Sequence, residues 1–252
     1  MKSRLIDTHC HMGDDGFDED RESIIEEARS REIAIISSGV TPNTWRKNLD
    51  ICRRYDNLYA SIGLSPAEHQ HLEELLEVLR EHRNELIAIG ECGLDYYIER
   101  DHEIRERQSE VFIELIQLAN DFNLPIQIHS RSAGKYALDI LKKQDAKMVH
   151  MHAFDGKSNL ARIASNEWGY YFSIPTSVVR SPQKQKLVKA INIERLLIET
   201  DSPVLSPERG TRNTPSNLPV ALQEVSRILR RGEDEMREII LENSCRLYKK
   251  LR

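Results

Sequence analysis

Residues 86–130, LIAIGECGLDYYIERDHEIRERQSEVFIELIQLANDFNLPIQIHS, decide the fold class of this chain. The segment opens with an apolar run over 86–94, which is typical of a buried strand. A longer stretch with apolar residues at helical spacing covers 102–122, and a second short apolar run covers 125–130. A strand, a helix and a strand in this order predict a right-handed βαβ unit with parallel strands.

The same alternation extends over the rest of the chain. We count eight apolar, β-branched runs, at residues 5–12, 33–40, 59–64, 86–94, 125–130, 148–154, 170–175 and 196–200. Helical patterns separate them, including 21–30, 44–55, 72–83, 102–122 and 134–143, and two closing helices are expected near 220–230 and 234–250. Eight repeats close into a barrel, whereas a doubly wound sheet usually has fewer strands and a Gly-rich phosphate turn after the first. No such turn occurs, so we expect an α/β protein with a (β/α)8 TIM barrel.

Length and composition agree with one barrel. The chain has 252 residues, of which 39% are hydrophobic and 31% charged, and no composition shift marks a boundary. We therefore expect residues 1–252 to form a single barrel domain. The net charge of -5 gives no global basic field, so any phosphate binding must be local.

The sequence also bounds the cellular setting. No apolar run is long enough to cross a bilayer, and the N-terminus has no signal-peptide pattern, which predicts a cytoplasmic protein without a membrane partner. The four cysteines show no CxxC spacing and are expected to be reduced thiols. No obligate protein partner is evident.

Two histidines at the end of the first apolar run indicate a metal site. Side chains alternate faces along a strand, so His9 and His11 are expected on one side, where both imidazoles could share a cation. Asp7 has the same parity, and we expect it to accept a hydrogen bond from one of these histidines and fix its tautomer.

Further metal-binding residue types follow later strands. Glu91, His129, His152 and Asp201 each stand at the end of a predicted strand. Barrel active sites form at the carboxyl ends of the strands, so these residues should meet at one mouth. Four imidazoles and two carboxylates suit Zn²⁺, Mn²⁺ or Fe²⁺ better than Ca²⁺, and a bridging carboxylate would allow two ions. Such a centre makes hydroxide near neutral pH, so hydrolysis is the expected reaction class.

The segments DTHCH, GECGLDYY, HSR, HAFDG, ETDSP and RGTRNTP resemble the signature segments of the TatD family of metal-dependent deoxyribonucleases, within the amidohydrolase superfamily. The resemblance covers nearly the whole chain. It implies a TIM barrel with one or two divalent metal ions, Zn, Mg or Mn, and DNA as the substrate. It also implies that His9 and His11 bind one ion, that Glu91 is shared, and that His129 and His152 bind the second. Asp201 would be a ligand that accepts the proton of the attacking water.

The chain departs from the family pattern at three places. The family usually has G-V-H-P-H where this chain has Gly63-Leu64-Ser65-Pro66-Ala67, so both histidines expected there are missing. Ser132 replaces an acidic residue that commonly follows H-x-R. His150 occupies a normally apolar position, and we interpret it as a packed, hydrogen-bonded core residue one layer below His152.

Substrate-binding candidates lie in the loops expected at the mouth. They are Arg131, Arg209, Arg212 and Asn213, whose side chains could hold phosphate oxygens. Asp95 could hold its loop or support a metal-binding residue, and Tyr96 and Tyr97 could stack on bases.

Two other functions remain open at this point. The same metal chemistry could hydrolyse a small amide, ester or cyclic substrate, as other amidohydrolases do. Alternatively, the chain could be a non-catalytic binding protein that keeps the cation site for structure or regulation. The complete ligand set with a proton acceptor favours the nuclease hypothesis.

Overall fold

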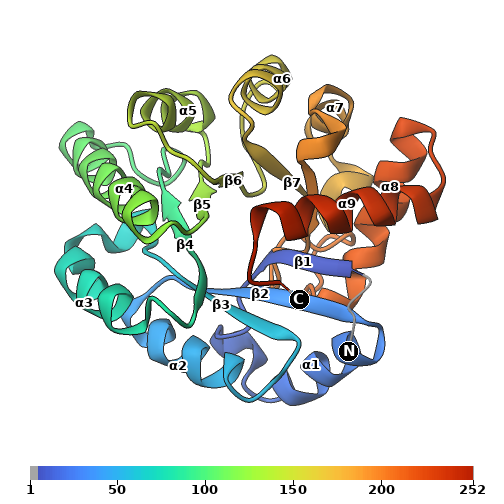
Figure 1. Ribbon diagram of the computed structural model, residues 1–252, viewed down its shortest axis with the longest axis horizontal. Coiled ribbons are helices and arrows are strands. Elements are labelled where there is room, and N and C mark those ends of the chain that lie inside the picture. Colours follow the sequence, from blue (N-terminus) through green and yellow to red (C-terminus); the bar gives the residue numbers. More distant parts are fainter. Residues whose placement is uncertain (1–4, 252) are drawn as a thin grey trace.

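The computed structural model describes residues 5–251 and shows eight strands arranged around a central axis (Figure 1). The strands are β1 (Leu5–Cys10), β2 (Ile33–Gly39), β3 (Leu58–Ile62), β4 (Leu86–Gly93), β5 (Ile126–His129), β6 (Val149–Met151), β7 (Tyr171–Pro175) and β8 (Leu196–Glu199). They lie in the order of the sequence, and each pairs in parallel with the next. The predicted (β/α)8 barrel is confirmed.

Contacts between the first and last strands bring the two ends of the sheet together. The backbone N–H of Asp201 donates to the carbonyl of His9 at 2.9 Å, and that of His11 donates to Ser202 at 2.8 Å. Thr8 Oγ1 donates to the Ile198 carbonyl at 2.9 Å. The DTHCH and ETDSP segments are therefore neighbours at the carboxyl ends of their strands.

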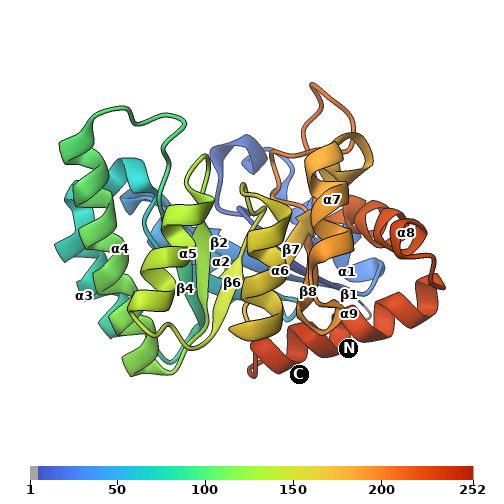
Figure 2. The ribbon, with the colours of Figure 1, turned by 90° about the horizontal axis from the view of Figure 1, so that it is seen from above.

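Nine α-helices are present among the described residues. They are α1 (Arg21–Ser30), α2 (Pro42–Cys52), α3 (Leu72–His82), α4 (His102–Phe122), α5 (Gly134–Lys143), α6 (Ser158–Glu167), α7 (Pro182–Ala190), α8 (Leu218–Leu229) and α9 (Glu233–Leu247). Most of them surround the strands, whereas α9 lies across one end of the barrel (Figures 1 and 2).

Helix α4 shows how local sequence sets an element. The Asp101 side chain accepts hydrogen bonds from the N–H groups of Glu103 and Ile104, which caps the first turn. Asn123 adopts a left-handed conformation at φ 52° and ends the helix. The buried stripe that includes Phe112 packs against the sheet, so the helix lies where the sequence predicts it.

The apolar interior has two parts, because strand side chains alternate faces. Along β2, for example, Ile33 and Ile35 belong to the large cluster between strands and helices, whereas Ala34 and Ile36 belong to a smaller one. This smaller cluster, which we call the barrel floor, has ten buried members: Ile6, Ala34, Ile36, Ile87, Ala88, Tyr171, Leu197, Leu247, Tyr248 and Leu251. The last three follow or end α9, so the C-terminal segment packs into the floor.

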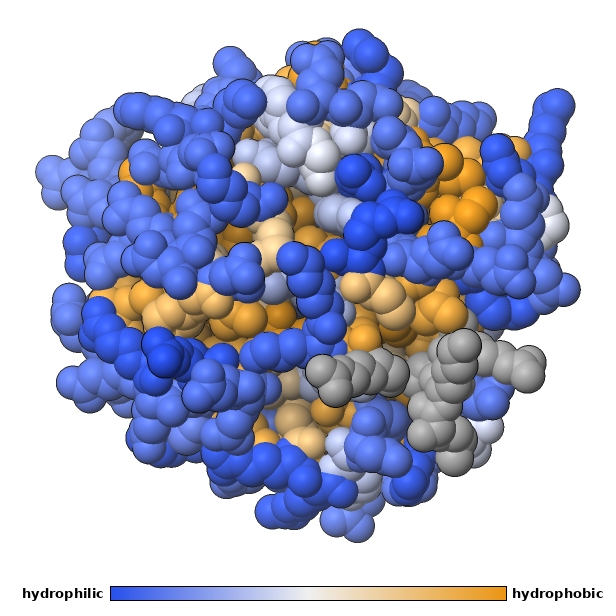
Figure 3. Space-filling view, in the orientation of Figure 1, coloured by the Kyte–Doolittle hydropathy of each residue, from blue (hydrophilic) through white to orange (hydrophobic). Residues whose placement is uncertain are grey.

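The surface is strongly polar. Figure 3, seen from the side that carries α9, shows hydrophilic side chains over most of this face, with apolar atoms visible between them. Within the described residues, no helix is both long and apolar enough to span a membrane. Cys10, Cys52 and Cys92 form no disulfide, as expected.

Candidate metal centre

The six predicted metal-binding residues come together at one mouth of the barrel. His9 Nε2 lies 2.8 Å from Glu91 Oε2, and His152 Nε2 lies 3.0 Å from the same oxygen. His129 Nδ1 lies 3.4 Å from Glu91 Oε1. His11 Nε2 lies 3.4 Å from Asp201 Oδ1. Residues more than 100 positions apart thus face one another across a few ångströms.

Glu91 occupies the centre of the cluster because two glycines let β4 approach β5 closely. A Cβ on Gly93, at φ +142°, would lie 2.1 Å from the carbonyl oxygen of His129. A Cβ on Gly90, at φ +138°, would lie 2.7 Å from the Cβ and carbonyl oxygen of Gln127. Only glycine fits these positions, so the G-E-C-G pattern holds the carboxylate in place.

Hydrogen bonds on the outer side of the imidazoles set their orientation. His9 Nδ1 is 3.0 Å from Gln127 Oε1, and His11 Nδ1 is 3.1 Å from the Ser38 carbonyl. Because both partners are acceptors, each Nδ1 carries the hydrogen and each Nε2 keeps a lone pair for the mouth. In contrast, His129 places Nε2 against Asp95 Oδ2 at 3.1 Å and presents Nδ1 to the mouth.

Asp95 has both of the roles expected for it. Its second carboxylate oxygen, Oδ1, accepts hydrogen bonds from the backbone N–H groups of Tyr97 and Ile98, which holds the loop after β4.

The prediction for Asp7 is wrong. Its carboxylate accepts hydrogen bonds from Thr200, at 2.8 Å from the backbone N–H and 2.5 Å from the hydroxyl, and not from a histidine ring. The register between β1 and β2 shifts between Asp7 and Cys10, which breaks the two-residue alternation on which the prediction depended. Burial raises the pKa of Asp7 to about 8.

Burial and close pairing shift the pKa values of the ionisable groups in the cluster. Burial opposes charge on His11, but its hydrogen bond to Asp201 and the charge of Glu91 raise its pKa to about 9. Burial also opposes charge on His129, but Asp95 and Glu91 raise its pKa to about 9. The pKa of His152 is raised well above its usual range, because the charge of Glu91 outweighs burial. Burial would raise the pKa of Glu91, but these imidazoles hold it well below its usual range.

The donor set fits a divalent ion. Glu91 Oε2 is buried and has no hydrogen-bond partner within the described chain, although two imidazole nitrogens face it. Three groups bring potential ligand atoms within 4.8 Å of one another: His9, His152 and Asp201; His9, His11 and Glu91; Glu91, His129 and His152. Glu91 belongs to two of these groups, which is the arrangement that a shared carboxylate requires.

Comparison with known proteins decides the family. The family model described as TatD related DNase matches residues 6–249. The chain belongs to the TatD family. It is 34% identical to human deoxyribonuclease TATDN3, with 98% of this chain and 96% of that protein covered. It is 32% identical to the uncharacterized metal-dependent hydrolase MJ1582 of Methanocaldococcus jannaschii, with 98% of each chain covered.

Solved structures agree with this assignment. The crystal structure of YJJV, a TatD homologue from Escherichia coli K12, matches with a TM-score of 0.90 at 26% identity, covering 99% of each chain. This TatD protein is therefore a metal-dependent hydrolase with the barrel of its family.

Two of the predicted substrate residues in the loop after β8 of this TatD chain make contacts within the protein. The buried Asn213 amide donates to Thr176 Oγ1 and to the carbonyls of Thr200 and Val204. The Arg212 guanidinium contacts the Asp20 carboxylate and the Gly16 carbonyl, and it lies over the Phe17 ring. These contacts show an internal use for both side chains, and a free phosphate-binding role is not favoured.

The other two arginines remain available. Arg209 is exposed. Arg131 is also exposed, and its guanidinium stacks 3.8 Å from the centre of the Tyr97 ring. Arg131 lines a cavity of about 410 Å³ together with three of the predicted metal-binding residues, His129, His152 and Asp201.

This cavity contains a residue that sequence reasoning missed. Lys184, on α7, lines the cavity together with Arg131, and its Nζ donates to the carbonyls of Ala153 and Phe154 at 2.6 and 2.8 Å. Burial lowers the pKa of this amine to about 8. Nothing in the spacing of Lys184 distinguishes it from other helix lysines, because only the packing of α7 brings it to the mouth.

Gln127 and Glu199 were also missed. Both are fully buried, and both contact histidines of the centre: Gln127 bonds to His9, and Glu199 Oε1 lies 3.7 Å from His152 Nδ1. A usable signal exists, since each is a polar residue within an apolar run and two positions before a predicted ligand.

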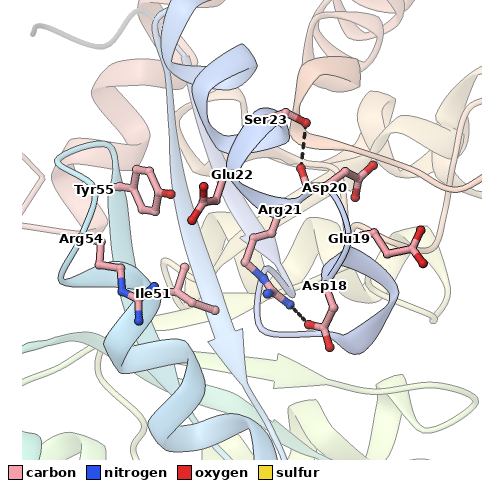
Figure 4. Close-up of a pocket in the computed structure, with 9 residues that line it drawn as sticks. All are labelled: Asp18, Glu19, Asp20, Arg21, Glu22, Ser23, Ile51, Arg54 and Tyr55. Atoms are coloured by element: carbon pink, nitrogen blue, oxygen red, sulfur yellow. Dashed lines mark hydrogen bonds and ion pairs between the residues drawn. The ribbon is translucent and has the colours of Figure 1, made fainter.

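A separate cavity of about 480 Å³ lies beside α1 and the end of α2 (Figure 4). It is lined by four carboxylates and two arginines: Asp18, Glu19, Asp20, Glu22, Arg21 and Arg54. Arg21 is already paired with Asp18. The excess of acidic groups is unfavourable for a polyanion.

Proposed function

We propose that this TatD-family chain is a deoxyribonuclease that hydrolyses phosphodiester bonds in DNA with one or two divalent ions of Zn, Mg or Mn. In this proposal residues 1–252 act as one barrel domain. The observation that carries it is the convergence of four imidazoles with the carboxylates of Glu91 and Asp201 at one mouth, beside a cavity that contains Arg131 and Lys184.

The ligand assignment follows the geometric groups. His9 and His11 bind one ion together with Glu91, and His129 and His152 bind the second with the same carboxylate. Asp201 lies between the first ion site and the cavity, since Oδ1 is 3.4 Å from His11 Nε2 and the residue also lines the cavity. This position suits a ligand that also accepts a proton.

The chemistry divides between the ions and the side chains. Bound divalent ions supply Lewis acidity, which polarises a phosphoryl oxygen and makes water a better proton donor. Asp201 accepts the proton of the attacking water at its carboxylate. Arg131 and Lys184 bind the non-bridging oxygens of the phosphate, where their charge offsets the charge of the transition state.

The surroundings of the mouth support an extended anionic substrate over a small amide or ester. A neighbouring cavity of about 630 Å³ shares Asp155 with the first and is lined by Lys135 and Lys157, which adds cationic groups beside the mouth. Tyr97 and Tyr136 are more than half exposed in the same region and offer faces on which bases could stack. The name of the human relative, deoxyribonuclease, supports the same substrate.

The decisive experiment compares substrates under defined metal conditions. Metal-free protein is incubated with Mg²⁺, Mn²⁺ or Zn²⁺ and with end-labelled single- and double-stranded DNA, RNA, bis-p-nitrophenyl phosphate, and a panel of esters and amides. We expect metal-dependent DNA cleavage that Asp201→Asn lowers about 10²- to 10⁴-fold, the usual range for loss of a proton acceptor. Asp139→Asn, on the exposed face of α5, is the matched control and should retain full activity.

Absence of phosphodiester cleavage with every metal would refute the nuclease proposal, and turnover of an ester or amide would then favour the alternative. DNA cleavage that survives Asp201→Asn would refute the assignment of the proton acceptor.

A further inference from the structure

A chain of buried hydrogen bonds runs beneath the metal centre and starts at His9. His9 Nδ1 donates to Gln127 Oε1, which also accepts a hydrogen bond from Ser38 Oγ at 2.8 Å. The Gln127 amide nitrogen uses its two hydrogens on the Thr8 carbonyl and on the hydroxyl of Tyr248, each at 2.9 Å. Gln127 is thus held on both ends of its amide, and every one of these groups is buried.

The chain continues from Tyr248 to His150 on the neighbouring strand β6. Because the Tyr248 hydroxyl accepts from Gln127, its own hydrogen is directed to His150 Nδ1, at 2.6 Å. His150 Nε2 then donates to Ser173 Oγ at 2.6 Å, and Ser173 donates to Glu199 Oε2 at 2.5 Å.

Glu199 is the last member of the path and lies beside His152, a second residue of the centre. Its other oxygen, Oε1, accepts from the backbone N–H of Ala153 at 2.7 Å and lies 3.7 Å from His152 Nδ1. The hydrogen-bonded path therefore runs in a single consistent direction from His9 on β1 to Glu199 on β8, and it ends beside His152, which follows β6. A neutral His150 with its hydrogen on Nε2 satisfies the whole path.

Tyr248 differs from the other members because it comes from no strand. It follows α9 and is fully buried in the barrel floor. Its hydroxyl is the point at which the branches to His9 and to His150 meet. The packing of the Tyr248 ring does not require the hydroxyl group, whereas both hydrogen-bonded branches require it.

We propose that Tyr248 is a positioning residue for the metal centre: its hydroxyl, together with Gln127, fixes the His9 ring with a hydrogen on Nδ1 and a lone pair on Nε2. The inference rests on the proposed metal site. Partners of this kind orient a metal-binding imidazole, and their loss typically lowers metal affinity by about 10- to 100-fold.

The experiment measures metal binding, not turnover. Zn²⁺ affinity of the full chain is determined by competition with a chelator for the wild type, Tyr248→Phe, Gln127→Met and the control Tyr171→Phe. Tyr171 lies in the same barrel floor, but its ring packs beneath Arg195 and not into the path. Proton NMR of ¹⁵N-histidine-labelled protein follows the Nδ1 hydrogen of His9, which a purely structural role of Tyr248 would leave unchanged.

We expect Zn²⁺ affinity to fall at least about tenfold in Tyr248→Phe and Gln127→Met, and to stay within about twofold in Tyr171→Phe. The Nδ1 hydrogen signal of His9 should broaden through exchange in both path variants. Wild-type affinity in Tyr248→Phe overturns the inference, as does an equal loss in Tyr171→Phe. If Tyr248→Phe does not fold, wild-type affinity in Gln127→Met overturns it. A wild type that binds no Zn²⁺ refutes the metal centre itself, so failure of the two proposals can be distinguished.

Discussion

Binding of divalent ions should release about three protons from this protein near pH 7. Without a cation, His11 and His129 have pKa values raised to about 9, and the pKa of His152 is raised well above its usual range. All three imidazoles are therefore cationic at pH 7. Metal ligation needs neutral imidazole, so each of these protons must leave when both ion sites fill.

The magnitude follows from the number of protons. Each released proton makes the apparent binding constant rise tenfold for each pH unit, which is about 1.4 kcal/mol. Three protons predict that the overall constant for filling both sites rises about a thousandfold from pH 6.5 to 7.5.

The stability of the metal-free protein should change in the opposite direction. A histidine whose folded-state pKa is raised stabilises the fold below its unfolded pKa, and this contribution is lost as the pH rises through the folded pKa. For His11 and His129 the window runs from about 6.5 to about 9. The melting temperature of metal-free protein should thus fall between pH 7 and 9.5.

Isothermal titration calorimetry tests the proton count directly. Zn²⁺ is titrated at pH 7 in buffers with different ionisation enthalpies, and the slope of observed enthalpy against buffer enthalpy gives the protons released. His102→Gln, which changes an exposed histidine on α4, is the control and should give the same slope. Release of fewer than one proton would refute the charged state described for these imidazoles.

Three further predictions concern single residues. Gly90→Ala should lower the free energy of unfolding by more than about 3 kcal/mol, because the added Cβ would overlap Gln127 at a strained φ. Gly232→Ala is the control and should change the melting temperature little, because the space around Gly232 is open. If DNA is the substrate, Lys184→Met should lower kcat/KM about 10- to 100-fold through loss of a charged hydrogen bond; an equal effect of the exposed Lys186→Met would contradict a specific contact. Arg212→Ala should lower the melting temperature slightly and leave KM unchanged, whereas a large rise in KM would restore its predicted role in substrate binding.

The sequence predicted the barrel and the mouth because both depend on local periodicity. Each strand shows as a short apolar run, and each ligand stands at the end of one, so fold topology alone brings His9 and Asp201 together. Helices such as α1, α4 and α5 occupy the ranges predicted for them. The helices α6 and α7 were not singled out, because their short apolar stripes are interrupted by polar residues.

Contacts that depend on register or on helix packing were harder to predict. The prediction for Asp7 was wrong because a shift in the pairing of β1 with β2 changes which face the next residues occupy, and no feature of the sequence marks that shift. Tyr248 and Lys184 reach the centre from helical segments far along the chain, so their positions depend on how those helices dock. The interpretation of His150 as a hydrogen-bonded core residue is confirmed, since it is fully buried between Tyr248 and Ser173.

The distribution of the ligands around the barrel also offers a practical tool. His9, His11 and Glu91 belong to the first four strands or follow them, and the same is true of His129, His152 and Asp201 for the second four strands. A break at the left-handed residue Asn123, between α4 and β5, would divide the ligands equally between two fragments. Neither fragment alone could hold a complete centre. Fusing the two to interacting partners would therefore turn metal capture into a signal that the partners have met.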